Sequence, residues 1–167
     1  MLNMLAAIVC FGDGTEAITS FFEERPIGLT IGKDKKDLHI EKITNEKTPI
    51  SISDDKTSTY RIRNWLPLND INYKKYIGAE SLAERILLLE AILKGNILSA
   101  LKGLDTRIDE TMRCSITNVS RPKIIKYKGV DLLGFDIEFK TNISLPQHLG
   151  LGKHCSVGFG NLTLKEC

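Results

Sequence analysis

The sequence has few cysteines, and no two of them stand at a metal-binding spacing. The four are Cys10, Cys114, Cys155 and Cys167. None forms a CxxC pair, and no group of cysteines and histidines has the spacing of a structural zinc site. We therefore expect free thiols in a reducing compartment, with no metal and no other cofactor.

Long hydrophobic runs and a strong net charge are also absent. The apolar run Met4–Phe11 is too short to cross a membrane, and Asp13 and Glu16 follow it. We expect a strand there, no membrane contact and a cytoplasmic protein. The 23 basic and 21 acidic side chains give a net charge of +2, so a nucleic-acid surface would have to come from local clustering of charge. With 167 residues, 42% of them hydrophobic, the chain fits a single domain, 1–167, with its own core.

Hydrophobic periodicity predicts both helices and strands. Apolar residues at helical spacing predict helices over Thr15–Glu24 and Glu80–Leu104, with a break near Gly95 left open. Alternation and turn signals predict strands over residues 4–11, 27–31, 38–43, 49–53, 59–66, 112–119, 123–127 and 132–143. This order is typical of an α+β, ferredoxin-like (RRM-like) βαββαβ sheet with both helices on one face, here with an extra β-hairpin. Because this fold hosts many unrelated activities, function must be argued from a site.

The most distinctive motif is a glycine-rich loop over residues 150–160, with the sequence GLGKHCSVGFG. Glycines permit positive φ and a close approach of the backbone to a ligand, so their N–H groups can face phosphate oxygens. Leu151 and Phe159 are suited to anchor the loop on the core, and a lysine adds a mobile positive charge. We expect a phosphate-binding loop with contacts from Gly150, Gly152, Lys153, Gly158 and Gly160. A nucleotide-binding loop, disfavoured because the spacing is not GxxxxGK[ST], and a surface turn without ligand remain as alternatives.

This loop resembles the glycine-rich loop of the CRISPR-associated repeat-processing endoribonucleases of the RAMP superfamily. Residues 60–76, 93–98 and 133–142 resemble the same family, so the similarity spans about residues 58–164. The resemblance implies binding of CRISPR repeat RNA by ferredoxin-like domains, with the loop holding the RNA. It also implies cleavage without a metal, in which a 2′-hydroxyl attacks the adjacent phosphate and leaves a 2′,3′-cyclic phosphate. Other CRISPR-associated proteins stay open as partners.

Such a cleavage needs a base for the 2′-hydroxyl and an acid for the leaving 5′-oxygen, and histidine suits both near neutral pH. Of the three histidines, His154 lies in the loop beside Lys153 and ranks first as a catalytic candidate. His39, on an expected strand, ranks second, and His148 comes just before the loop. An ordinary surface role stays open for each of them.

Arginines and aromatic residues offer further RNA contacts. Arg61 and Arg63 alternate along an expected strand with Tyr60, Ile62 and Asn64. They therefore share a face that can contact phosphates or simply be solvated. Trp65, Tyr73 and Tyr76 can stack on bases, although their spacing is more typical of packing in a core.

Three hypotheses follow from these observations. The first is a repeat-RNA endoribonuclease, and the second is a non-catalytic RAMP-like RNA-binding or complex subunit. The third is an unrelated ferredoxin-like protein that only forms subunit contacts. Cleavage assays separate the first two, and salt-dependent RNA binding separates both from the third.

Overall fold

The structure, a computed structural model, describes residues 7–23, 28–31, 33–37 and 40–165. The chain divides into two compact units, Met1–Lys47 and Thr48–Cys167, called unit 1 and unit 2 below. Whether they act as the one domain, 1–167, that the sequence predicts stays a prediction.

Unit 1 contains one helix and one hairpin. Helix α1 spans Gly14–Glu23, and strand β1, Gly28–Ile31, pairs antiparallel with β2, Asp34–Asp37. The predicted helix and first hairpin strand are therefore confirmed over the described residues. The strand predicted over residues 4–11 is wrong where it is described, because residues 7–11 have no strand partner. The second hairpin strand comes earlier than predicted, and residues 40–43 are irregular.

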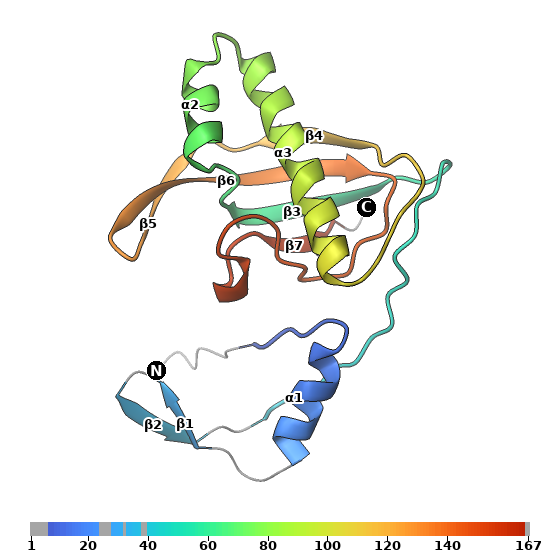
Figure 1. The fold of residues 1–167 in the computed structure, drawn as a ribbon, viewed down its shortest axis with the longest axis vertical. Helices are drawn as coiled ribbons and strands as arrows, with labels where there is room; N and C mark the ends of the chain where they lie inside the picture. The colour runs from blue at the N-terminus through green and yellow to red at the C-terminus, as the bar shows by residue number, and fades with distance from the viewer. Residues whose placement is uncertain (1–6, 24–27, 32, 38–39, 166–167) are drawn as a thin grey trace. The chain divides into compact units, whose positions relative to one another are not determined.

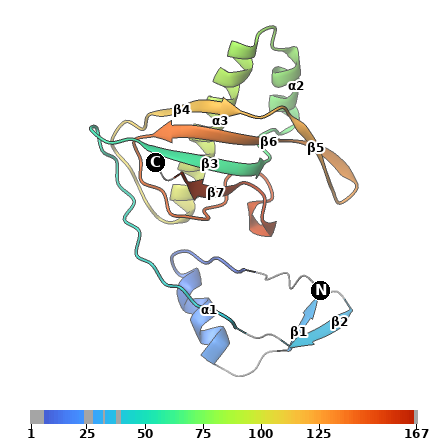
Figure 2. The ribbon, with the colours of Figure 1, turned by 180° about the vertical axis from the view of Figure 1, so that it is seen from behind.

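Unit 2 is built on an antiparallel sheet with the strand order β4-β6-β3-β7. These strands are β3, Ser58–Trp65; β4, Cys114–Val119; β6, Val130–Thr141; and β7, Asn161–Leu164. Strand β5, Lys123–Tyr127, pairs with the first part of β6 as a hairpin. Helices α2, Asp70–Gly78, and α3, Leu82–Gly103, lie on one face, in front of the sheet in Figure 1 and behind it in Figure 2.

The connections of unit 2 make this a ferredoxin-like arrangement. Strands β3 and β4 are both antiparallel to β6, which lies between them, so β3, α3 and β4 form a split βαβ unit. The predicted α+β class with helices on one face is confirmed. The elements differ from those expected, because α1 belongs to unit 1 and the connection from β6 to β7 carries only a short 3-10 helix, η1, Cys155–Val157.

The core of unit 2 lies between α3 and the sheet. Apolar residues at intervals of four keep one side of α3 buried, at Leu89, Leu93, Ile97 and Leu101. They pack with the inward side chains of β3 and β6, such as Ile62 and Phe139, which are fully buried. Ser81 caps the helix by accepting the Glu84 amide at 3.1 Å. The predicted helix over residues 80–104 is confirmed, and no break occurs at Gly95.

None of the described helices is both long and apolar enough to cross a membrane.

Candidate nucleic-acid interface

The glycine-rich loop is fastened to the end of β3 by backbone hydrogen bonds. The Leu151 amide donates to the Gly160 carbonyl at 2.9 Å, which closes the loop at its base. The Gly160 amide donates to Asn64 at 3.2 Å, and the Lys153 amide donates to Leu66 at 3.0 Å. Leu151 is buried, so the predicted anchor at this position is confirmed. The loop therefore has a fixed base.

Two of the glycines serve the packing of this base. Gly152 has φ +91°, and a Cβ there would lie 2.9 Å from the Trp65 indole and 3.0 Å from the Leu66 carbonyl. Gly160 has φ +66°, and a Cβ there would run into the carbonyl oxygen of Leu151. Both positions need glycine for conformation and for space.

The other two glycines differ in the room around them. Gly150 has an ordinary φ, but a Cβ there would lie 2.6 Å from the Cβ of Cys155. Gly158 has φ +95° and no atom within 4 Å of the position of a Cβ, so a ligand can approach its backbone. The predicted RNA contacts of the four glycines stay predictions.

The exposed part of the loop presents Lys153 and His154 to solvent. Within the part of the chain that the structure describes, the amides of residues 154–156 donate no hydrogen bond to the protein. The exposed part of the loop can therefore offer an ammonium group and unbonded N–H groups, the two kinds of donor that a phosphate-binding loop uses.

The tip of the β5–β6 hairpin lies against this loop. The ring of Tyr127 is 4.5 Å from that of His154 and 5.6 Å from that of Phe159, centroid to centroid. The Nζ of Lys128 lies 5.5 Å from the centroid of the Tyr127 ring. We call this cluster of Tyr127, Lys128, Lys153, His154 and Phe159 the hairpin–loop corner. It joins segments that are far apart in the sequence.

The other two histidines lie elsewhere. His148 is exposed, and its Nδ1 is 3.2 Å from Asn161 Oδ1. His39, the second catalytic candidate, lies outside the described residues. Of the two histidines within the described residues, only His154 therefore lies beside Lys153.

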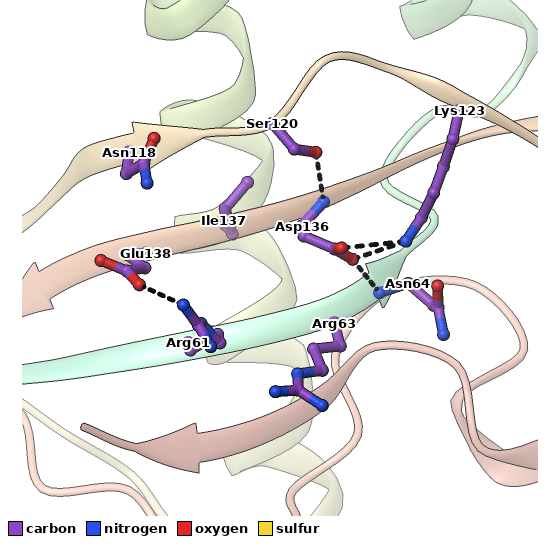
Figure 3. A pocket seen from close by; sticks show the side chains of 9 residues that line it. All are labelled: Arg61, Arg63, Asn64, Asn118, Ser120, Lys123, Asp136, Ile137 and Glu138. Carbon is purple, nitrogen blue, oxygen red and sulfur yellow. Dashed lines mark hydrogen bonds and ion pairs between the residues drawn. The ribbon is translucent and has the colours of Figure 1, made fainter. Parts of the chain in front are cut away.

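The predicted strand face of Arg61 and Arg63 is found on the side of the sheet opposite α2 and α3, here called the open face. Both arginines are exposed, whereas the alternate residues Tyr60 and Ile62 are buried. The face contains a shallow depression of about 450 Å³, lined by the nine residues drawn in Figure 3. They are Arg61, Arg63, Asn64, Asn118, Ser120, Lys123, Asp136, Ile137 and Glu138.

Acidic residues neutralise much of the positive charge of the open face. Glu138 accepts from Arg61 and Lys165, each at 2.8 Å. These two hydrogen bonds hold the pKa of Glu138 below its usual value. Arg61 is therefore already paired, and a phosphate would have to compete with this carboxylate.

Asp136, the other carboxylate of the open face, stabilises a bulge in strand β3. Strand β3 bulges between Ile62 and Trp65, and Asn64 has φ +51° there. The Asn64 amide donates to Asp136 at 2.7 Å, and Lys123 donates to both carboxylate oxygens at 2.9 Å. Burial raises the pKa of Asp136, but these hydrogen bonds and the charges of Lys123 and Arg63 hold it below its usual value.

Sequence reasoning missed Tyr127, Asp136 and Glu138. Both carboxylates lie on the predicted strand 132–143, where Glu138 is opposite Arg61 and Asp136 comes two residues earlier on the same side. A prediction that paired this strand with the arginine strand would therefore have pointed to them. Of the proposed stacking residues, Trp65 and Tyr76 are buried and Tyr73 is exposed on α2. The packing alternative is therefore confirmed for the first two.

The comparisons with known proteins relate unit 2 to one family. The family model described as the Cas6b C-terminal domain matches residues 52–164, which lie within unit 2. An uncharacterized protein of Methanocaldococcus jannaschii, MJ0978, is 38% identical over 105 residues, which are 63% of this chain and 70% of that protein.

Solved structures show the same relationship. One described as Cas6b is 30% identical, with a TM-score of 0.64, and the match covers 79% of this chain and 70% of that one. One described as the CRISPR RNA processing endoribonuclease Cas6b is 28% identical, with a TM-score of 0.69 over 88% of this chain and 71% of that one. Csf5, described as a type IV Cas6 crRNA endonuclease, shares the fold at 20% identity and a TM-score of 0.51, over 72% of this chain and 48% of that one.

Proposed function

The chain belongs to the family of Cas6b C-terminal domains, and on that premise we propose that it binds CRISPR repeat RNA and cleaves CRISPR transcripts. The observation that carries this proposal is the agreement between the matched residues, 52–164, and the unit that holds the glycine-rich loop. A solved relative with 28% identity is a CRISPR RNA processing endoribonuclease, which supports the same activity here.

We further propose that the cleavage needs no metal. In such a step the 2′-hydroxyl of one nucleotide gives its proton to a base and attacks the adjacent phosphorus. The bond from phosphorus to the 5′-oxygen breaks, an acid protonates that oxygen, and a 2′,3′-cyclic phosphate remains. His154 is suited to one of these proton transfers, because its ring nitrogens hydrogen-bond to no described residue and it is exposed. Lys153 beside it would stabilise the charge that develops on the phosphate.

The test is cleavage of a cognate repeat hairpin by the purified protein in excess EDTA. We expect the wild type to cut it and His154→Ala to cut about 10²–10⁴-fold more slowly. His148→Ala is a matched control, since His148 is also exposed and also has a positive φ, 64° against 58° for His154. Loss of cleavage in His39→Ala with normal cleavage in His154→Ala would move the role to His39.

A second candidate function is a non-catalytic RNA-binding or complex subunit of the same family. One observation favours it: the ring of His154 packs against Tyr127, and no second histidine accompanies it within the described part of the loop. A wild-type protein that binds the repeat but never cuts it would establish this candidate and exclude the nuclease.

A further inference from the structure

The aromatic rings of unit 2 are divided unevenly between its core and its surface. Five of them belong to the core: Tyr60, Trp65, Tyr76, Phe135 and Phe139. None of the residues that line the depression of the open face is aromatic. Tyr127 and Phe159, both half-buried, are brought together at the hairpin–loop corner, where the imidazole of His154 joins them.

The three rings of the corner contact one another at an angle. The imidazole of His154 lies over Tyr127 at 4.5 Å with a tilt of 44°, and Phe159 meets Tyr127 edge to face at 5.6 Å and 79°. His154 is the exposed member, whereas the rings behind it are half-buried. The imidazole is therefore open to solvent and has an aromatic ring beside it.

Two lysines are next to these rings in the sequence, and the Nζ of Lys128 lies 5.5 Å from the centroid of the Tyr127 ring. Lys128 follows Tyr127 at the hairpin tip, and Lys153 precedes His154 in the loop. Both lysines are exposed, and neither forms an ion pair within the described residues. This contrasts with Arg61 and Lys165 of the open face, which share Glu138. Aromatic rings beside unpaired cations are the combination by which proteins hold single-stranded nucleic acid.

The corner also continues the open face. Alternation along β5 places Lys123 and Tyr127 on the same side of that strand, and Lys123 reaches Asp136 on the open face. A strand of RNA that crosses the depression would thus meet the rings at its end.

We propose that the hairpin–loop corner is a stacking site for one unpaired ribonucleotide. Its base lies on the imidazole of His154, Tyr127 supports that ring from behind, and Lys128 and Lys153 bind the phosphates on either side. This inference rests on the proposed function, since it assigns the part of the RNA that the corner holds. Stacking does not require a particular base, so the site is tolerant of sequence.

The test compares two fluorescent probes of equal length and charge, an adenosine homopolymer and an abasic ribose-phosphate oligomer, by fluorescence anisotropy. We expect wild-type protein to bind the adenosine probe about tenfold more tightly, the value of one stacked base. Tyr127→Leu should abolish this preference and leave binding of the abasic probe unchanged. Tyr127→Phe, which keeps the ring, should retain it.

Tyr73→Leu is the matched control, because Tyr73 is an exposed tyrosine of α2 on the other face of the sheet. His154→Leu adds a variant at an exposed position, where a loss of folding is not expected, and it should lose the preference as Tyr127→Leu does. A preference that survives both leucine variants, or that disappears in Tyr73→Leu, would overturn the proposal.

The outcome also separates this inference from the proposed function. Wild-type protein that binds and cuts the repeat hairpin but binds both probes equally would refute stacking and leave the function intact. His154→Phe separates the two roles of this residue. It should keep the preference for the adenosine probe, because the ring remains, and it should lose cleavage if the imidazole also transfers a proton.

Discussion

The open face and the hairpin–loop corner of unit 2 both hold positive charge, but they differ in how it is balanced. On the open face, Glu138 takes up Arg61 and Lys165, and Asp136 takes up Lys123. At the corner, Lys128 and Lys153 lie beside aromatic rings with no described carboxylate partner. Under the proposed function, we therefore expect the lysines of the corner to contribute more to RNA binding than the paired cations of the open face.

The largest effect is expected on the free energy of unfolding, when a glycine of the loop that forms the corner is replaced. Gly160→Ala and Gly158→Ala both place a side chain at positive φ, which destabilises by about 1–2 kcal/mol. Only at residue 160 does the new Cβ meet backbone, so we expect a further loss of about 1–3 kcal/mol there. Chemical denaturation measures both. Equal losses in the two variants would show that close packing at Gly160 does not matter.

The next prediction concerns the salt dependence of RNA binding, and it compares a lysine of the corner with an arginine of the open face. Lys153→Ala should weaken RNA binding and reduce the slope of log K against log salt by about 0.7, the share of one phosphate contact in a single strand. Arg61→Ala should change the slope less, because Glu138 already neutralises Arg61. Titration of repeat RNA at several salt concentrations measures the slopes.

Lys102→Ala, at the last turn of α3, is the control for an exposed lysine away from both regions. An unchanged slope in Lys153→Ala would remove Lys153 from the interface. A larger change in Arg61→Ala than in Lys153→Ala would reverse the contrast between face and corner.

The smallest effect concerns acid stability of the open face. The pKa values of Asp136 and Glu138 lie below the ordinary values of 3.8 and 4.5, so their contribution to stability is fully present above those values. It is lost as pH falls through the lowered values. We expect the thermal midpoint to fall less steeply from about pH 5 to pH 3 in the double variant Asp136→Asn, Glu138→Gln.

Circular dichroism measures these midpoints. Asp109→Asn serves as control, because its pair with Arg107 is almost fully exposed, at 81% and 88%, and such pairs contribute little. A double variant with the same pH dependence as the wild type would show that these carboxylates do not stabilise the open face.

The parts of the fold that could be predicted are those where local pattern and tertiary packing agree. Helix α3 repeats apolar residues at the interval that its contact with the sheet requires, so the sequence identified it. Helix α2 was not predicted, because only Tyr76 is buried within it and the helix therefore lacks a repeating apolar pattern. Its clearest signal in the sequence is Asn69, whose side chain caps the helix by accepting from the Asn72 amide. A strand was expected over residues 49–53, but Ile52 forms only an isolated bridge to Ile143.

The candidate site was predictable to a similar degree. The glycine motif and the arginine strand could be read from spacing, because both depend on neighbours in the chain. Tyr127 could not, since its contact with His154 depends on the pairing of β5 with β6 and on the path of the loop. The reason for glycine at residues 152 and 160 likewise became clear only from Trp65 and the Leu151 carbonyl.

The position of β7 beside β3 has a consequence for biosynthesis. Arg61 of β3 is paired with Thr163, which comes 102 residues later. At ribosomal rates of roughly 5–20 residues per second, the nascent chain waits about 5–20 s before this neighbour is made. During that interval one side of β3 offers unpaired amides and carbonyls to any other extended chain. When β7 pairs with β3, it covers that side of the long strand and leaves only its own edge, four residues long, exposed in its place.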